Sequence, residues 1–198
     1  LKNALAGLNA TVGDQIKAQS GYASYTGANG WIGSLTFMQP GKGYMYYSAN
    51  NTTHNFVYPS SLSQRVNALR AKQESQNRWQ ANESKFAGSM TITAIVIHSD
   101  AEIRSDQIEL AAFSGNECRG TVMLQYVESL DKYMGFLMVY GENNDDISLR
   151  IFDHNANQEI AVNNVALRFA TDAMHGSPNN PYQVNTGTTG ITDNLWLN

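Results

Sequence analysis

Hydrophobic and polar residues alternate in short runs through the second half of the chain. Residues 107–113 (QIELAAF) and 147–151 (ISLRI) carry an apolar side chain at every second position. This period of two is typical of strands that bury one face. Residues 90–98 and 133–140 are apolar at nearly every position, which indicates strands buried on both faces. The second of these runs is the more hydrophobic, and we expect it to be a central strand.

Polar turns separate these runs. We expect a hairpin turn at 114–117 and a polar turn at 141–146, with further strands at 118–125 and 165–169. Six or more strands at this spacing predict a mainly β fold, an antiparallel β-sandwich of the immunoglobulin-like or jelly-roll-like kind, over residues 86–185. The chain does not show the alternation of strands with helices that is typical of a parallel sheet, so we do not expect a parallel sheet.

The first 59 residues have a different pattern. Leu1, Leu5 and Leu8 recur at helical spacing and predict a short first helix. Glycines then punctuate runs rich in Tyr, Trp, Ile and Phe, and 40–43 (PGKG) is a tight turn. We therefore expect a small Gly- and aromatic-rich β subdomain at 1–59, with one or two short helices, before the sandwich.

Residues 60–85 contain neither Gly nor Pro, and Leu62, Val66 and Leu69 form a helical stripe. They predict a helical connector, with a surface loop as the alternative. The proposed organisation has four parts, which are the subdomain at 1–59, the connector at 60–85, the sandwich at 86–185 and a linker tail at 186–198. Trp79 and Trp196 are expected to seal a junction.

Composition narrows the function classes. The chain has 198 residues, of which 42% are hydrophobic and 15% charged, and its net charge is −4. The acidic balance argues against general nucleic-acid binding. The single Cys118 excludes an internal disulfide. The longest apolar runs are too short for a helix that spans a bilayer. A first residue that is not Met leads us to expect a segment of a longer or processed protein.

Candidate chemistry is sparse. His54, His98, His154 and His175 lack metal-ligand spacing and are expected to be exposed loop residues. Acidic residues crowd two turns, at 100–106 and 142–146, but neither matches an EF-hand, so calcium is considered and not predicted. Cys118 has no nearby His and is expected to be packed. We predict no metal, no cofactor, no catalytic residue and no enzymatic activity.

An aromatic cluster is the remaining candidate site. Trp31, Tyr25, Tyr44 and Tyr46 lie close together in the sequence. Flat aromatic faces beside Asn and Gln suit saccharides, because apolar sugar faces stack on rings while amides bond the hydroxyls. We predict these four residues as a ligand-binding platform. The alternative is that they fill the core of a small subdomain.

Two stretches carry a family resemblance. Residues 30–35 (GWIGSL) with 38–45 (MQPGKGYM), and 106–120 (DQIELAAFSGNECRG), are similar in order and spacing to a module of Bacteroidetes surface and secreted proteins that precedes a C-terminal sorting domain. Matches at 139–141 and 151–153 extend the resemblance over about residues 30–180. It implies a β-sandwich after a small domain, and it carries no catalytic residues. Met38 and Ser114 depart from the usual Leu and Val.

The E-C-R-G part of this pattern (residues 117–120) has a folding interpretation. Cys118 is expected to point inward, Arg119 to reach a carboxylate such as Asp106, and Gly120 to allow a bulge or a close strand approach. The resulting hypothesis is a non-catalytic extracellular binding or adhesion module of a larger bacterial cell-surface protein. A glycan or a host or surface protein would be its partner, besides flanking domains of the same chain. A structural spacer and an accessory domain of an exported hydrolase are the alternatives.

Overall fold

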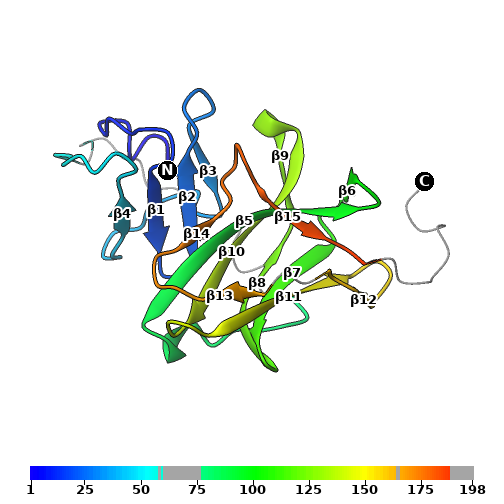
Figure 1. Cartoon of the computed structure of the whole chain (residues 1–198). Coiled ribbons are helices and arrows are strands. Elements are labelled where there is room, and N and C mark those ends of the chain that lie inside the picture. Colours follow the sequence, from blue (N-terminus) through cyan, green and yellow to red (C-terminus); the bar gives the residue numbers. More distant parts are fainter. Residues whose placement is uncertain (58, 60–76, 164–165, 188–198) are drawn as a thin grey trace.

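The chain folds into three layers of β-sheet (Figure 1). The computed structural model describes residues 1–57, 59, 77–163 and 166–187. The first sheet is antiparallel and has the order β3-β2-β1-β4. Its strands are β1 (Gln15–Ala18), β2 (Gly21–Tyr25), β3 (Trp31–Gly33) and β4 (Met45–Tyr47).

The second sheet forms the middle layer and is built on two long antiparallel strands. These strands are β5 (Gly88–His98) and β10 (Lys132–Gly141), which pair from Gly135↔Ala94 to Gly141↔Gly88. The shorter members are β6 (Ala101–Glu102), β9 (Gln125–Val127), β14 (Met174–His175) and β15 (Tyr182–Asn185). The last two pair with β5 in parallel, so the sandwich is antiparallel except along this one edge.

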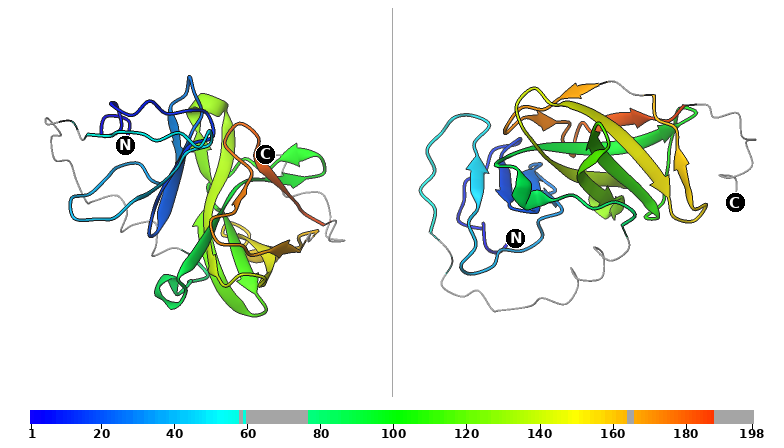
Figure 2. Two further views of the ribbon diagram at one scale, coloured as in Figure 1. Left: turned by 60° about the vertical axis from the view of Figure 1, so that its left-hand side comes forward. Right: turned by 90° about the horizontal axis from the view of Figure 1, so that it is seen from below.

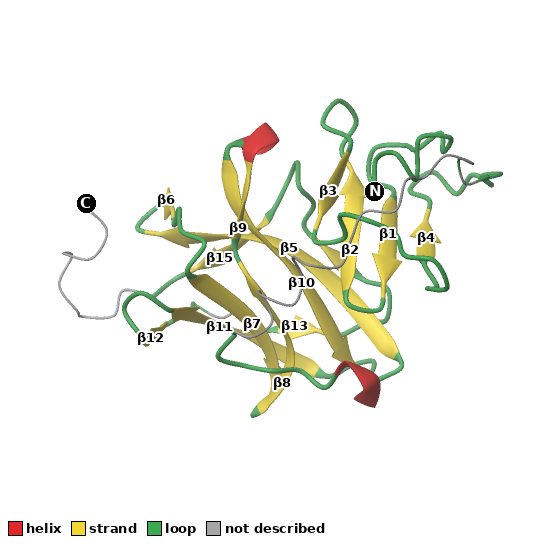
Figure 3. Cartoon of the chain, turned by 180° about the vertical axis from the view of Figure 1, so that it is seen from behind, coloured by secondary structure: helices red, strands yellow, loops and turns green. Residues whose placement is uncertain are grey.

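The third sheet has the order β12-β11-β7-β8, and β13 pairs with β11. Its strands are β7 (Ile108–Ser114), β8 (Glu117–Met123), β11 (Asp146–Asp153), β12 (Gln158–Ile160) and β13 (Leu167–Arg168). Two short 3-10 helices, η2 (Glu83–Lys85) and η3 (Glu128–Leu130), lie at opposite ends of the long strands (Figure 3).

The second and third sheets enclose the main hydrophobic core, which confirms the predicted β-sandwich. The alternation of side chains along each strand explains how this core forms. One side of the second sheet carries apolar side chains from both long strands, namely Ile92, Ala94 and Val96 of β5 and Leu137 and Val139 of β10. The predicted hairpin turn at 114–117 and the one-sided strand at 147–151 are both present.

The other face of the second sheet packs against the first sheet (Figure 2). The intervening residues of β10, such as Phe136 and Met138, join Tyr22 and Ile32 of the first sheet in a second cluster. Because β10 is covered on both faces, its continuous hydrophobic run matches its place in the molecule. The central position expected for residues 133–140 is confirmed.

Gly120 sets how closely β8 approaches β10. A Cβ atom at this position would lie 1.9 Å from the carbonyl oxygen of Met138. In addition, the register of β7 with β8 shifts between Ala112 and Phe113, which leaves Arg119 as the extra residue of a bulge. Both the bulge and the close approach expected of Gly120 are therefore present.

The structure corrects several expectations near the ends of elements. Residues 2–7 form hydrogen-bonded turns and no helix, since Gly7 and the following loop stop the single Leu1–Leu5 turn from propagating. The strand expected at 165–169 is reduced to β13. The predicted helix stripe of Leu62, Val66 and Leu69, and Trp196 in the tail, lie outside the described residues.

Candidate functional site

The four predicted platform residues lie in the first sheet and its loops. Trp31 contacts Tyr25, with ring centroids 5.3 Å apart, and Tyr46, at 6.3 Å. Tyr44 packs against the same hydrophobic cluster as Trp31 and Tyr46, and its hydroxyl accepts a hydrogen bond from the Gln39 amide at 2.7 Å. All four side chains are half-buried. Three of the four predicted rings, those of Tyr25, Trp31 and Tyr46, therefore contact one another in a row.

These rings also have a packing role. Trp31, Tyr44 and Tyr46 pack against a third hydrophobic cluster, which includes Leu5 and Ile16. The alternative that the aromatic residues fill the subdomain core therefore has direct support. Ligand binding by the four residues stays a prediction.

Buried Asp14 fixes the edge of this row. Its carboxylate accepts hydrogen bonds from the Tyr46 hydroxyl, the Thr11 amide at 2.7 Å and the Ala49 amide at 2.8 Å. Burial acts to raise the pKa of Asp14, but these hydrogen bonds outweigh it and hold that pKa below its ordinary value. Burial and the neighbouring carboxylate raise the pKa of Tyr46. The Tyr46 hydroxyl is therefore engaged in holding the loops together.

A second aromatic surface lies at the end of the β9–β10 hairpin. Tyr126 of β9 and Tyr133 of β10 are direct cross-strand partners. Their ring centroids are 5.2 Å apart and the ring planes are inclined by 40°. Tyr126 is 48% exposed, whereas Tyr133 leans on the main core. We call this pair the tyrosine surface.

Charged side chains form the rim of the tyrosine surface. Arg104 lies 5.9 and 5.7 Å from the ring centroids of Tyr126 and Tyr133. It donates to the Asp131 carbonyl at 2.9 Å and to its carboxylate at 2.5 Å. These bonds use two of the five N–H groups that a guanidinium has, so donors remain at a side chain that is 46% exposed. The Tyr126 hydroxyl also donates to Asp131.

Sequence reasoning missed this surface because its parts are far apart in the chain. Tyr126 and Tyr133 are seven residues apart across η3, and Arg104 arrives from the segment after β6. One local signal existed, since two aromatic residues flank the polar run 128–132 (ESLDK). Aromatic cross-strand pairs beside such a turn are a known stabilising arrangement.

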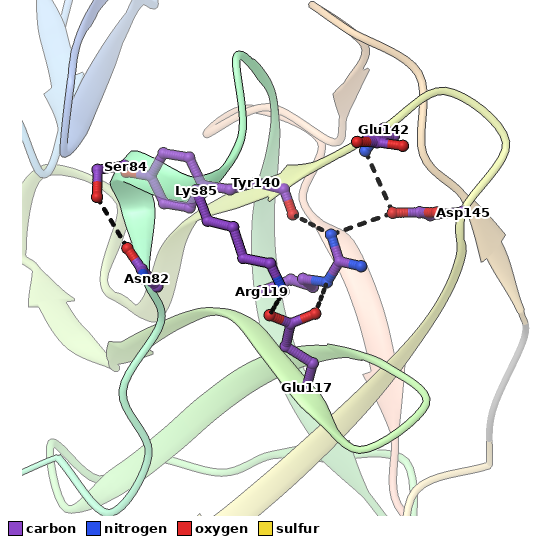
Figure 4. Close-up of polar contacts among 8 residues, drawn as sticks. All are labelled: Asn82, Ser84, Lys85, Glu117, Arg119, Tyr140, Glu142 and Asp145. Carbon is purple, nitrogen blue, oxygen red and sulfur yellow. Dashed lines mark hydrogen bonds and ion pairs between the residues drawn. The ribbon is translucent and has the colours of Figure 1, made fainter.

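An ion cluster around Arg119 joins three loops at the other end of the sandwich (Figure 4). The guanidinium lies 4.0 Å from the Phe86 ring centroid, 3.1 Å from the Asp145 carboxylate and 3.5 Å from that of Glu117. Glu117 also binds Lys85 of η2. The expected partner of Arg119, Asp106, is wrong, because the bulge in β8 turns Arg119 toward β10 and the 141–146 turn. The Glu and Arg of E-C-R-G thus fix surrounding loops.

Glu109, like Asp14, has no exposed surface. Its carboxylate accepts hydrogen bonds from the backbone amides of Arg78 and Trp79, the Thr121 hydroxyl and the His154 ring. Trp79 in turn packs edge-on against the rings of Phe113 and Phe152. Trp79 therefore covers the outer face of the third sheet, which is not where the first sheet meets the sandwich; the expected junction role of Trp79 stays a prediction.

The histidines differ from the expectation of exposed loop residues, because all four are half-buried. His98 and His175 lie on strands, and His54 packs against Tyr46. His154 is held by Glu109 at 2.7 Å. Because Glu109 is 45 residues away from His154 in the sequence, no local pattern indicates that contact.

The acidic turns engage protein partners. Asp145 binds Arg119, and the Glu102 carboxylate accepts the Tyr133 amide at 2.6 Å. Within the described part of the chain, no three His, Cys, Asp or Glu side chains converge as a metal site. Likewise, the described residues include no helix long and apolar enough to cross a membrane.

Cys118 is half-buried, with its Sγ atom 3.6 Å from the Gly120 carbonyl oxygen. Burial raises the pKa of this thiol, which lowers the fraction of reactive thiolate at neutral pH. The packed position expected for Cys118 agrees with this environment.

Two concave regions accompany these surfaces. A cleft of about 460 Å³ separates the first sheet from η2 and the start of β5, lined by Lys17, Phe86 and Tyr140 among others. Lys17 is held in it by Asp172 at 2.5 Å. A second pocket of about 290 Å³ lies where β5 turns into β6.

Comparison with known proteins adds no relative. No family model matches the chain, and no curated protein or solved structure matches it significantly. The geometry of the chain's own surfaces therefore carries the functional argument.

Proposed function

We propose that this chain is a non-catalytic, saccharide-binding module of a larger bacterial cell-surface or secreted protein, and that the tyrosine surface is its contact site. One observation carries the proposal, namely that Tyr126 is a 48% exposed aromatic residue beside the charged rim of Arg104 and Asp131. The module's surface context rests on the sequence resemblance and on the amide-rich composition.

The chemistry of the tyrosine surface favours a sugar over other ligands. An exposed ring face offers a stacking plane for the apolar face of a pyranose, and the adjacent guanidinium and carboxylate can donate to and accept from hydroxyl groups. The positive groups Arg104 and Lys132 are paired with the acids Asp131 and Glu102. This balanced charge favours an uncharged saccharide over an anionic one.

A glycan array tests the proposal. The soluble chain is applied with calcium and again with a chelator, and Tyr126→Ala is compared with the intact chain. The matched control is Tyr47→Ala, because Tyr47 is an equally exposed tyrosine (47%) on β4 of the first sheet. We expect a saccharide-specific signal that Tyr126→Ala removes and Tyr47→Ala retains.

Other outcomes assign the function differently. Loss on Trp31→Ala or Tyr46→Ala in a folded chain, with Tyr126→Ala unaffected, would move the site to the predicted platform. No signal for any saccharide would contradict the proposal. Signal lost in chelator would show a calcium requirement.

A structural spacer is the second candidate, and the contact between the first and second sheets favours it. Buried side chains hydrogen-bond across this contact, as in Tyr22 with Thr93 at 2.8 Å. Such contacts would hold two units in one orientation. Resistance of the intact chain to limited proteolysis, together with a silent array, is the result expected of a spacer.

A further inference from the structure

The rim of the tyrosine surface is held by its own backbone. Asp131 follows η3 in the left-handed region, at φ 48° and ψ 48°, and its amide donates to the Glu128 carbonyl at 3.2 Å. In this conformation Asp131 offers two acceptors to Arg104, which donates to its carbonyl at 2.9 Å and to its carboxylate at 2.5 Å. Attachment at two points fixes the orientation of a planar guanidinium as well as its position.

The exposed ring is tied to the same carboxylate. The Tyr126 hydroxyl donates to Oδ1 of Asp131 at 2.9 Å, and Arg104 donates to this same oxygen. The guanidinium carbon of Arg104 lies 5.9 and 5.7 Å from the ring centroids of Tyr126 and Tyr133, which are themselves 5.2 Å apart. The cation therefore lies beside both rings. Groups held by several contacts have less conformational entropy to lose when a ligand binds.

Both members of the rim keep unused hydrogen-bonding capacity. Among the described residues, only two of the five N–H groups of Arg104 have an acceptor within hydrogen-bond distance. No described residue donates to Oδ2 of Asp131, whose side chain is 73% exposed. The hydrogen bonds from Tyr126 and Arg104 lower the pKa of Asp131, so its carboxylate stays ionised and remains an acceptor at neutral pH.

A donor and an acceptor side by side select the kind of group that binds. A ligand carboxylate can accept from Arg104, but it has no proton to donate to Asp131, which repels it. A ligand ammonium can donate to Asp131, but it cannot accept, and Arg104 repels it. A hydroxyl group both donates and accepts. Two adjacent hydroxyls of a pyranose therefore satisfy both partners, since one accepts from Arg104 while the other donates to Asp131.

We propose that Arg104 and Asp131 form a clamp for two adjacent hydroxyl groups of an uncharged pyranose whose apolar face stacks on Tyr126. This inference rests on the proposed function and deepens it, because it names the residues that determine specificity and the group that they recognise. Stacking on Tyr126 uses an apolar face that many sugars share. The clamp adds selection for sugars in which two neighbouring hydroxyls are free.

A series of sugars tests the recognised group. The intact chain is titrated by NMR with methyl β-glucopyranoside, methyl α-mannopyranoside and methyl β-galactopyranoside, and then with forms of the bound sugar that each lack one hydroxyl. Removal of either clamped hydroxyl should weaken binding by about tenfold, as a lost hydrogen bond predicts. The two sensitive positions should be neighbours on the sugar ring. Sensitive positions that are not neighbours, or no sensitive position, would overturn the clamp.

Two substitutions test the residues of the clamp. Asp131→Asn keeps the positive φ, which asparagine tolerates, and keeps an acceptor for Arg104, but it replaces the unused oxygen by an N–H₂ donor. It should move the ratio of affinities for the neutral glycoside and its uronate about tenfold toward the uronate. Arg104→Met keeps an apolar stem. It should move the ratio about tenfold toward the amino sugar with its amine protonated.

Glu128→Gln is the matched control, because it removes a negative charge from the same turn. Glu128 is exposed, and its side chain has no hydrogen bond or ion pair with a described residue. At about 0.15 M ionic strength, where the Debye length is about 8 Å, this variant should shift the affinity ratio by less than about twofold. A shift as large as that of Asp131→Asn would mean that net charge causes the selectivity, and it would overturn the clamp.

The clamp and the proposed function fail in different ways. Each affinity ratio is measured within one variant, so a partly unfolded sample does not change it. If Tyr126→Ala removes saccharide binding while Asp131→Asn and Arg104→Met leave their ratios unchanged, the clamp is wrong and saccharide binding at the tyrosine surface stands. If the intact chain binds none of the three glycosides and no saccharide of the array, both proposals are wrong.

Discussion

The two faces of the second sheet differ in chemistry although the same strands form both. The face toward the third sheet is covered by aliphatic side chains with one methionine and one phenylalanine, such as Leu137 and Ile151. The face toward the first sheet instead buries polar groups among aromatic ones. There Gln15, Lys17 and Tyr22 meet β5 and its neighbours through hydrogen bonds.

This difference separates stability from orientation. We call the face of the second sheet toward the third sheet the inner face, and the face toward the first sheet the outer face. Apolar contacts are non-directional, so the inner face stabilises the sandwich in proportion to the area it buries. Hydrogen bonds are directional and add little net stability, but a broken one leaves a buried group unsatisfied. We infer that the outer face mainly fixes how the first sheet is placed on the sandwich.

The largest effect is expected on the inner face. Leu137 has no exposed surface, and Leu137→Ala leaves a cavity in the main core. We expect the free energy of unfolding to fall by about 2–5 kcal/mol, measured by urea denaturation. The control is Tyr47→Ala on the exposed edge of the first sheet, which should change stability by less than about 1 kcal/mol. Equal effects would mean that the inner core is not the source of stability.

A double-mutant cycle tests the directional character of the outer face. Tyr22→Phe or Thr93→Val alone removes one partner of the 2.8 Å hydrogen bond, and each should cost about 1–2 kcal/mol of unfolding free energy. The double variant should cost clearly less than the sum, because neither hydroxyl is then left unsatisfied. Simple additivity would show that this hydrogen bond does not link the two sheets.

A smaller effect is expected for the ion pair at the edge of the same contact. Asp172 is 53% exposed where it meets Lys17, so water can solvate its carboxylate if the lysine is lost. Lys17→Met keeps the apolar stem and should change the free energy of unfolding by about 1 kcal/mol or less. A loss comparable to that of Leu137→Ala would make this pair a principal support of the contact.

The smallest effect concerns pH and the hydrogen bonds of Asp14 at the edge of the aromatic row in the first sheet. The lowered pKa of Asp14 means that its hydrogen bonds stabilise the fold above the unfolded-state pKa and that this contribution is lost as pH falls through the folded-state pKa. Tyr46→Phe removes one of these bonds, so the pKa of Asp14 should rise toward its ordinary value. The acid-unfolding midpoint should move to higher pH, monitored by tryptophan fluorescence. An unchanged midpoint in Tyr46→Phe would contradict this role.

Local patterns predicted much of the sandwich. Period-two runs located β7 and β11, the continuous run at 133–140 located the central β10, and the 114–117 turn was placed correctly. Gly120 was assigned a close approach from its position in the pattern, and the 1.9 Å distance to Met138 explains it. These features depend on neighbouring residues, whose alternation is fixed by backbone geometry.

The candidate sites were less predictable. The clustering of aromatic residues in the sequence predicted a ligand-binding platform that includes Trp31 and Tyr46. In the structure the rings of both residues are half-buried in a packed row. The tyrosine surface was missed, because Tyr126 becomes adjacent to Arg104 only when the segment after β6 packs beside the β9–β10 hairpin. The solvent exposure of an aromatic side chain depends on the rest of the fold and cannot be predicted from the residue type alone.

The sequence by itself determined that the chain is mainly β, where most of its long strands lie and which of their side chains face a core, since all of these follow from short-range periodicity. Only the tertiary structure decided that Arg119 meets Asp145 and not Asp106, and that Glu109 holds the backbone at 78–79. The physical reason is that hydrogen bonds and ion pairs join atoms across strands. Their partners are set by register, bulges and sheet stacking, which arise from the packing of the whole chain.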